Sequence, residues 1–335
     1  MKRSDAYRSA MDGLHYTPEQ KENLAHSIEA AQTAAPKKTR KNIYWRTALV
    51  AAALAVVLTV GAGATGILKA PAEVFQSLFA LTPAQTEIVN KIGHPVDASA
   101  TDNGLTISVD AVMGDDSNVC IAYSFTFADG LPANLPAPDE NGRLPLGFGA
   151  QLTDLGKSGG AHGSSYFLDP DPTDQQIQYI EIWSTSYKDL AGSKVNAYFE
   201  DLMLYPSSKN PAALLEGKWE IPFRADYEDC SITLQNHAPF TWEDTLYTLQ
   251  SVTISPLAVR VDYTTDNDSP ESSNADIPLT VQKTDGSVLE LQLGGGTQNT
   301  HLGQVQCHKN GLLPEIIPLD EIQSITFGGV EIPLH

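Results

Sequence analysis

The apolar positions fall into one long uncharged run, a helical N-terminal stretch and a C-terminal region with a period of two. Residues 48–68 read ALVAAALAVVLTVGAGATGIL, 21 residues without a charge or a proline. A helix of that length extends about 31 Å, close to the hydrocarbon thickness of a bilayer. The run therefore predicts a transmembrane helix. A buried core helix is the alternative, but core helices rarely extend this far without a charge.

Basic residues predict the orientation of this helix. Five Lys and Arg lie within positions 37–46, whereas only Lys69 follows the run closely. Because basic flanks stay in the cytoplasm, the N-terminus is predicted inside and the C-terminal bulk outside the cell membrane. The predicted membrane residues are Trp45 at the interface and Leu49, Val56, Leu58, Ile67 and Leu68 within the run.

A cleaved signal peptide is the main alternative to an uncleaved anchor. Lys69-Ala70-Pro71-Ala72 would then be its cleavage site. Signal peptides have a short basic region before a shorter apolar stretch, whereas here 47 residues precede the run. The sequence therefore favours the anchor.

Residues 1–35 carry the pattern of two short amphipathic helices. Met11 and Leu14 lie on the apolar stripe of the first helix. Thr17-Pro18-Glu19-Gln20 is a typical helix start, and Leu24 and Ile28 lie on the stripe that follows it. Two such helices bury too little surface to be stable alone, so these four apolar residues are predicted to dock against a cytoplasmic protein. A tail that lies on the membrane or stays disordered is the alternative.

The pattern after the uncharged run predicts two helices and then a series of strands. Residues 72–79 and 83–92 have helical spacing, and residues 104–112 and 119–127 form a predicted β-hairpin. Further strands are predicted at residues 177–184, 194–205, 218–224, 231–235, 245–254, 258–264, 278–283, 289–293 and 322–327. Residues 128–176 are rich in Pro, Gly and Asp and are predicted to be mostly loops.

The spacing of these strands predicts the fold class and the domains. Short strands about ten residues apart, separated by Gly, Asp and Pro turns, are typical of β-sandwiches rather than of parallel βαβ units. The predicted fold is therefore mainly β. It comprises a cytoplasmic helical tail at residues 1–47, a transmembrane helix at 48–68, and extracytoplasmic β-sandwich-like domains at 69–227 and 228–335.

Charge is divided at the uncharged run. The 335 residues have a net charge of −20, but residues 1–47 contain nine Lys and Arg against five Asp and Glu, and residues 48–335 contain 12 against 36. A small basic part and a large acidic part agree with the predicted orientation. The acidic bulk repels a phosphate backbone, so direct binding of nucleic acid is not expected.

Acidic residues in two loops resemble calcium ligands only superficially. Asp169, Asp171 and Asp174 lie in one loop, and Asp266 and Asp268 lie in another. Neither group is followed by the Gly and the distant Glu of an EF-hand loop. Both loops are therefore predicted to be solvated.

Other residue types with chemical potential do not complete a motif. Gly294-Gly295-Gly296 lacks the Lys-Ser/Thr ending of a phosphate loop, and the His and Ser residues at 162–165 have no G-x-S-x-G elbow. Cys307, His308 and His301 do not have zinc-ligand spacing. No catalytic residue, cofactor or metal is predicted, and the protein is not expected to be an enzyme.

Cysteines and tryptophans of the outer part are expected to be structural. Cys120 lies in a predicted strand, and Cys230 and Cys307 lie near strand ends, so one disulfide or three buried thiols would fit. The tryptophans at positions 183, 219 and 242 are expected in the core.

Several stretches resemble one bacterial family. Gly93-His94-Pro95-Val96, residues 100–107, Val109-Asp110-Ala111-Val112 and Asp115-Asp116 are similar to the domain-of-unknown-function family 4179 (DUF4179). Residues 217–223 and 252–259 resemble the immunoglobulin-like module that often follows it, and residues 10–16 resemble the N-termini of such proteins.

The resemblance implies a single-pass membrane protein that acts as an anti-sigma factor for an extracytoplasmic-function sigma factor. The family has no established catalytic residues to carry over. The tail contains no Cys, so it lacks the His-Cys-Cys zinc motif of better-known anti-sigma factors, and a thiol switch in the tail is excluded.

The expected function is that of a transmembrane regulator. Its tail would hold a cytoplasmic sigma factor, and its outer domains would respond to an envelope ligand or protease. The first alternative is a surface binding module that the transmembrane helix tethers to the lipid bilayer. The second is an envelope hydrolase, for which the sequence offers no nucleophile.

Overall fold

The computed structural model describes residues 69–156, 160–186, 189–204, 212–267, 275–301 and 304–334. These residues are mainly β, as predicted, with two short helices before the strands. None of the described helices is long and apolar enough to span a membrane. The predicted tail helices and the predicted span at 48–68 lie outside the described residues.

Helices α4 (Pro71–Phe79) and α5 (Pro83–Ile92) agree with the two helices predicted for this stretch. Each begins with a proline, whose missing N–H would have no helical partner in the first turn. At the start of α5, the hydroxyl of Thr82 accepts from the N–H of Gln85, and the Gln85 side chain accepts from the N–H of Thr82. This reciprocal capping box explains why α5 begins where the sequence indicates.

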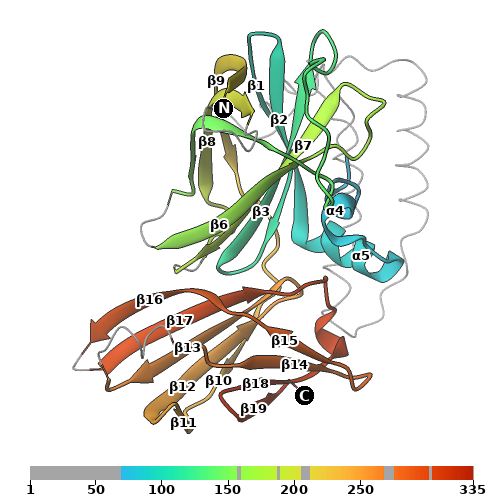
Figure 1. Cartoon of the computed structure of the whole chain (residues 1–335). Coiled ribbons are helices and arrows are strands. Elements are labelled where there is room, and N and C mark those ends of the chain that lie inside the picture. Colours follow the sequence, from blue (N-terminus) through green and yellow to red (C-terminus); the bar gives the residue numbers. More distant parts are fainter. Residues whose placement is uncertain are drawn as a thin grey trace, which may run out of the picture. The chain divides into compact units, whose positions relative to one another are not determined.

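Two antiparallel sheets form the first β region, which we define as residues 93–224 (Figure 1). The larger sheet has the order β1 (Gly93–Asp102), β2 (Leu105–Gly114), β3 (Asn118–Phe127), β7 (Gln176–Thr185), β6 (Ala161–Leu168) and β4 (Arg143–Leu144). The smaller sheet has the order β5 (Leu146–Asp154), β8 (Lys194–Leu204) and β9 (Ala212–Arg224). The predicted hairpin at 104–127 is therefore present as β2 and β3.

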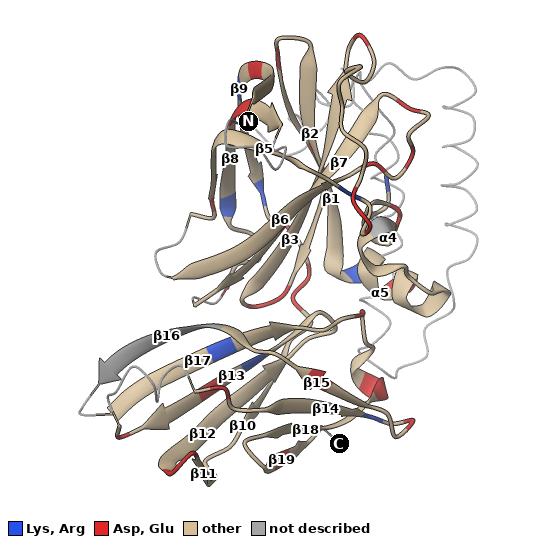
Figure 2. Ribbon diagram, viewed as in Figure 1, with Lys and Arg blue, Asp and Glu red and all other residues tan. Residues whose placement is uncertain are grey.

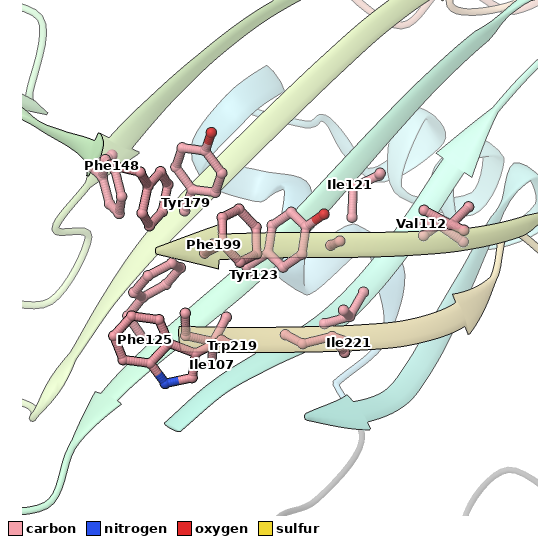
Figure 3. Close-up of a cluster of buried hydrophobic side chains, with 14 of the residues drawn as sticks. Ile107, Val112, Ile121, Tyr123, Phe125, Phe148, Tyr179, Phe199, Trp219 and Ile221 are labelled. Atoms are coloured by element: carbon pink, nitrogen blue, oxygen red, sulfur yellow. The ribbon is translucent and has the colours of Figure 1, made fainter. Parts of the chain in front are cut away.

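Aromatic side chains fill the core between these two sheets (Figure 3). Phe125 of β3 and Tyr179 of β7 meet Phe148 of β5 and Phe199 of β8, and the Phe148 and Phe199 ring centroids are 4.6 Å apart. The edge-to-face and tilted arrangements of these rings are the ones that aromatic pairs prefer. Trp219 of β9 is fully buried in the same cluster.

One carboxylate lies inside this aromatic core. Glu181 of β7 is fully buried and accepts hydrogen bonds from Tyr123 Oη and Thr153 Oγ1, both at 2.8 Å, and from the amide of Gln151. Because Thr153 and Gln151 belong to β5, these bonds join the two sheets. Burial raises the pKa of Glu181, and its hydrogen bonds oppose that shift.

The second β region, defined here as residues 232–333, also contains two antiparallel sheets. One has the order β10 (Ile232–Gln235), β12 (Thr245–Ile254), β13 (Ala258–Thr265), β17 (Gln304–Leu312) and β16 (Gly294–His301), with β11 (Pro239–Trp242) on β12. The other has the order β15 (Val288–Leu291), β14 (Leu279–Lys283), β18 (Ile322–Phe327) and β19 (Val330–Pro333). Apolar residues from both sheets form a second core around Tyr263 and Phe327.

The loop prediction for residues 128–176 was wrong in part, because β4, β5 and β6 lie there. These strands carry Gly, Ser and Gln at positions that other strands of the protein fill with apolar residues, so they lack the alternation that identifies a strand. Strands β1, β11, β16, β17 and β19 were also not predicted.

The predicted division at residues 227/228 stays a prediction. Strand β9 ends at Arg224 and β10 begins at Ile232, and no described sheet takes strands from both sides of this gap. Nevertheless, the two sides share an apolar cluster, and the described residues belong to one compact unit.

Candidate functional site

The predicted partner-binding and membrane residues belong to the first 68 residues of the chain. Met11, Leu14, Leu24 and Ile28 of the tail lie outside the described residues. The same holds for Trp45, Leu49, Val56, Leu58, Ile67 and Leu68. The candidate site begins with the segment that directly follows the predicted span.

Helix α4 is held in place by hydrogen bonds of its backbone and by a buried apolar side chain. The N–H of Ala72 donates to the side chain of Asn90 in α5 at 2.9 Å, and the amide of Gln178 in β7 donates to the carbonyl of Val74 at 2.9 Å. Phe75, one residue further along α4, is fully buried. The first helix after the predicted span is therefore anchored to α5 and to the larger sheet.

An apolar cluster joins both helices to both β regions. It includes Phe75, Val89 and Ile92 of the helices, Met113, Cys120 and Ile180 from β2, β3 and β7, and Leu257, Ala258 and Ile316 beyond residue 231. In addition, the amide of Gln85 in α5 donates to the carbonyl of Ile316 at 2.8 Å. We call this cluster the joint. A displacement of α4 or α5 would disturb both β regions because they share one buried surface.

A small cavity lies between α4 and the larger sheet. It has a volume of about 310 Å³, and Lys69, Glu73, Asp110, Ser124 and Asp174 contribute to its lining. The hydroxyl of Ser124 donates to the carboxylate of Asp110 at 2.5 Å. Burial raises the pKa of Asp110 to about 6, while the Ser124 hydrogen bond and the charge of Lys69 oppose the shift.

Asp110 makes stability depend on pH. The folded state holds this proton more tightly than the unfolded chain does, so its stabilising contribution is complete below about pH 4 and is lost as the pH rises through about 6. We expect the free energy of unfolding of a fragment of residues 69–335 to rise by about 1 kcal/mol from Asp110 alone between pH 7 and pH 5. Urea denaturation at the two pH values measures it.

Two variants separate this contribution from the general effect of acid on an acidic protein. Asp110→Asn should remove about 1 kcal/mol of the pH dependence, whereas the exposed Asp129→Asn should leave it unchanged. An unaltered pH dependence in Asp110→Asn would contradict the assignment.

The turn between β2 and β3 is a second part of the site. Asp115 is 3% exposed, and its Oδ1 accepts from the N–H of Ser117 at 3.0 Å and from the N–H and side-chain amide of Asn118, both at 2.8 Å. Its Oδ2 accepts from the hydroxyl of Ser255 at 2.6 Å. Because Ser255 belongs to the second β region, one buried carboxylate both shapes the turn and connects the two regions. Burial raises the pKa of Asp115, against these hydrogen bonds.

The other candidate residues take structural positions. Asp171 and Asp174 accept hydrogen bonds from nearby backbone N–H groups in an exposed loop, and Gly294 begins strand β16. Cys120, Cys230 and Cys307 are free thiols, of which Cys120 and Cys307 are buried. Among the described residues, no group of three or more His, Cys, Asp or Glu is placed to hold a metal ion.

Sequence reasoning singled out neither Asp110 nor Asp115 as a functional residue. The sequence of β3 does indicate that other elements cover both faces of this strand, because residues 119–123 are apolar on both faces. Such a strand must be covered on both sides. The covering elements are the sandwich core on one face and α4 and α5 on the other.

A comparison with protein families relates this site to a known group. Residues 39–126 match the family model described as "Domain of unknown function (DUF4179)". The match confirms the predicted resemblance to DUF4179. The matched stretch covers α4, α5, β1 and β2 and ends within β3, so it includes both Asp110 and Asp115.

Comparison with solved structures returned "The crystal structure of the conserved domain protein from Bacillus anthracis". That protein is 14% identical, and the alignment covers 70% of this chain and 75% of that chain with a TM-score of 0.48. No curated protein matches the chain.

Proposed function

We propose that this protein is a single-pass membrane regulator, an anti-sigma factor whose N-terminal tail holds an extracytoplasmic-function sigma factor. The observation that carries the proposal is the uncharged run at 48–68, with a basic tail before it and an acidic, β-rich body after it. A bilayer accommodates such a run as a helix and leaves its basic side in the cytoplasm.

The joint supports a role in signalling. A single transmembrane helix transmits a signal when the segment that enters it moves, turns or is cut. Here that segment leads into α4, which is fastened to α5 and β7 and is packed against residues of both β regions. A change in either β region would therefore alter the support of α4.

Proteolytic release fits the same arrangement only after α4 has moved. Ala70 is exposed, but Pro71 and Ala72 are buried and begin the helix. A protease needs several consecutive residues in an extended and accessible form. We therefore propose that cleavage at Ala70-Pro71-Ala72 depends on prior release of α4.

The tail is tested with the full-length chain in its native organism. The double variant Leu24→Asp with Ile28→Asp places two charges on the predicted apolar stripe. We expect that the sigma factor no longer co-purifies with this variant and that transcription from the factor's promoters rises. The reason is that burying two charges in an apolar groove costs more free energy than the helix gains by binding there.

The matched control must carry its charges on the opposite face of the predicted helix. His26→Asp with Ala30→Asp adds two carboxylates at the same spacing on that face. Retention of the sigma factor by this control and its loss in the Leu24/Ile28 variant is the expected result. Equal retention by both variants would contradict the proposal and favour a tethered surface module.

A further inference from the structure

A polar cleft lies on the face of the β12–β13–β17 sheet that is turned away from the second core. Its volume is about 500 Å³, and its lining includes Gln250, Arg260, Asp262 and Gln306 on the strands and Ser186 after β7. Strand β13 alternates strictly here, so Val259 and Val261 point into the second core while Arg260 and Asp262 lie on the opposite face.

Arg260 and Asp262 form a rigid pair at the base of this cleft. Arg260 is only 5% exposed, its Nη2 lies 3.0 Å from Asp262 Oδ1, and its Nη1 and Nη2 donate to the carbonyl of Ser186 at 3.3 and 3.4 Å. Ser251 donates to the other Asp262 oxygen at 3.2 Å. Holding a buried guanidinium is costly unless it is paired, so these bonds pre-organise a fixed donor beside a fixed acceptor.

The walls of the cleft also offer both donors and acceptors. Gln250 is oriented by Thr264, whose hydroxyl accepts from its amide at 3.2 Å, and by His237, whose ring nitrogen lies 3.2 Å from its Oε1. Gln306 is exposed on the neighbouring strand β17. A carboxamide both donates and accepts. The lining therefore combines an ion pair with neutral hydrogen-bond donors and neutral acceptors.

The strand order excludes recognition of an extended peptide by β-strand addition. Strands β13 and β17 are internal to their sheet, with β12 and β16 as their outer neighbours (Figure 1). Their backbone groups are therefore already paired on both sides. A ligand in this cleft must be recognised by side chains instead.

Charge and polarity narrow the class of ligand further. Asp and Glu far outnumber Lys and Arg along the described chain (Figure 2), and Asp262 neutralises Arg260, so a phosphorylated ligand is disfavoured. The mainly polar lining does not suit an apolar molecule. A hydroxyl group both donates and accepts, so neighbouring hydroxyls on a ring match adjacent fixed donors and acceptors.

We propose that this cleft binds a neutral, hydroxyl-rich saccharide of about two sugar rings, a size that suits a cavity of this volume. The ion pair Arg260–Asp262 forms the floor, and Gln250 and Gln306 bind ring hydroxyls from the sides. This proposal deepens the proposed function because it names the chemistry of the outer signal. It rests on the proposed function only for the location of the cleft outside the cell. Ser186 belongs to the first β region, so the saccharide contacts both regions at once.

The test uses the full-length chain in lipid nanodiscs, applied to an array of neutral mono- and oligosaccharides, with calorimetric titration of the saccharides retained. We expect retention of a subset of the saccharides and a loss of affinity of about two- to tenfold in Gln306→Ala, because this variant loses one hydrogen-bonding contact. Arg260→Lys, which keeps the charge but loses the planar fork, should lose binding as well. The matched control Gln323→Ala removes an exposed glutamine of β18 outside the cleft and should bind normally.

Two results would contradict saccharide binding in the cleft. Failure to retain any saccharide, or unchanged affinity in Gln306→Ala, would overturn it. The Leu24/Ile28 double variant should bind saccharide like the unmodified chain because the tail takes no part in the cleft. Saccharide binding and sigma-factor binding can therefore fail separately.

Discussion

Replacing Asp115 with Ala is expected to lower the free energy of unfolding by about 3–5 kcal/mol. The substitution removes the acceptor of four hydrogen bonds, from two donors of Asn118, the N–H of Ser117 and the hydroxyl of Ser255. A buried donor left without a partner costs about 1–3 kcal/mol, and water entering the space left by the carboxylate recovers part of the sum. Urea denaturation of residues 69–335, followed by circular dichroism, measures the loss.

Two further variants separate the functions of Asp115. Asp115→Asn keeps the carbonyl oxygen that orders the turn and removes the buried charge, so its loss should be well below that of Asp115→Ala. Ser255→Ala leaves the β2–β3 turn intact but removes the bond to Asp115 and also the acceptor of the N–H groups of Leu257 and Ala258. We expect a loss of about 2–3 kcal/mol from this variant. Equal losses for Asp115→Ala and Asp115→Asn would show that the oxygen that orders the turn contributes little.

Trp219→Ala is expected to lower stability by a similar amount, about 3–5 kcal/mol. The side chain is fully buried, and its Nε1 donates to the carbonyl of Leu105 at 3.0 Å, which joins β9 to the start of β2. A methyl group on Gly217 would approach the indole ring to 2.5 Å, so the backbone at Gly217 is fitted closely around the ring. Truncation therefore leaves a cavity that this stiff surrounding cannot close.

Two control variants test whether the lost stability comes from the buried indole ring. Trp219→Phe keeps most of the ring volume but leaves the Leu105 carbonyl without its donor, so about 1–2 kcal/mol should be lost. Leu152, which is 63% exposed on β5, should tolerate Ala with a change within about 0.5 kcal/mol. A large loss in Leu152→Ala would indicate that the whole β5–β8–β9 sheet is sensitive to truncation, and would contradict a special role for Trp219.

Strands with apolar alternation could be predicted from sequence, and strands without it could not. Strands β12 and β18 have the predicted bounds because their core-facing residues are Tyr, Leu, Val, Ile and Phe. Strand β1 was missed although a strong signal was available. Asn103 and Gly104 both have positive φ values and form a two-residue turn that pairs Asp102 with Leu105.

The polar parts of the candidate site escaped prediction for a different reason. Asp110, Asp115 and Glu181 are buried by elements distant in sequence, namely α4, the second β region and β5. Local patterns treat an aspartate in a turn or on the polar face of a strand as solvated. Only tertiary packing reveals that these carboxylates are covered.

The attachment of α4 also determines how the protein would yield under mechanical force. Tension applied at Lys69 reaches α4 first, where the load falls on the Ala72–Asn90 and Val74–Gln178 bonds and on one apolar face. In an antiparallel sheet, many interstrand hydrogen bonds share the load, whereas the few contacts of a short helix can break one after another. Under such tension we expect helix α4 to detach before the sheets and to repack on the same buried surface once the tension is removed.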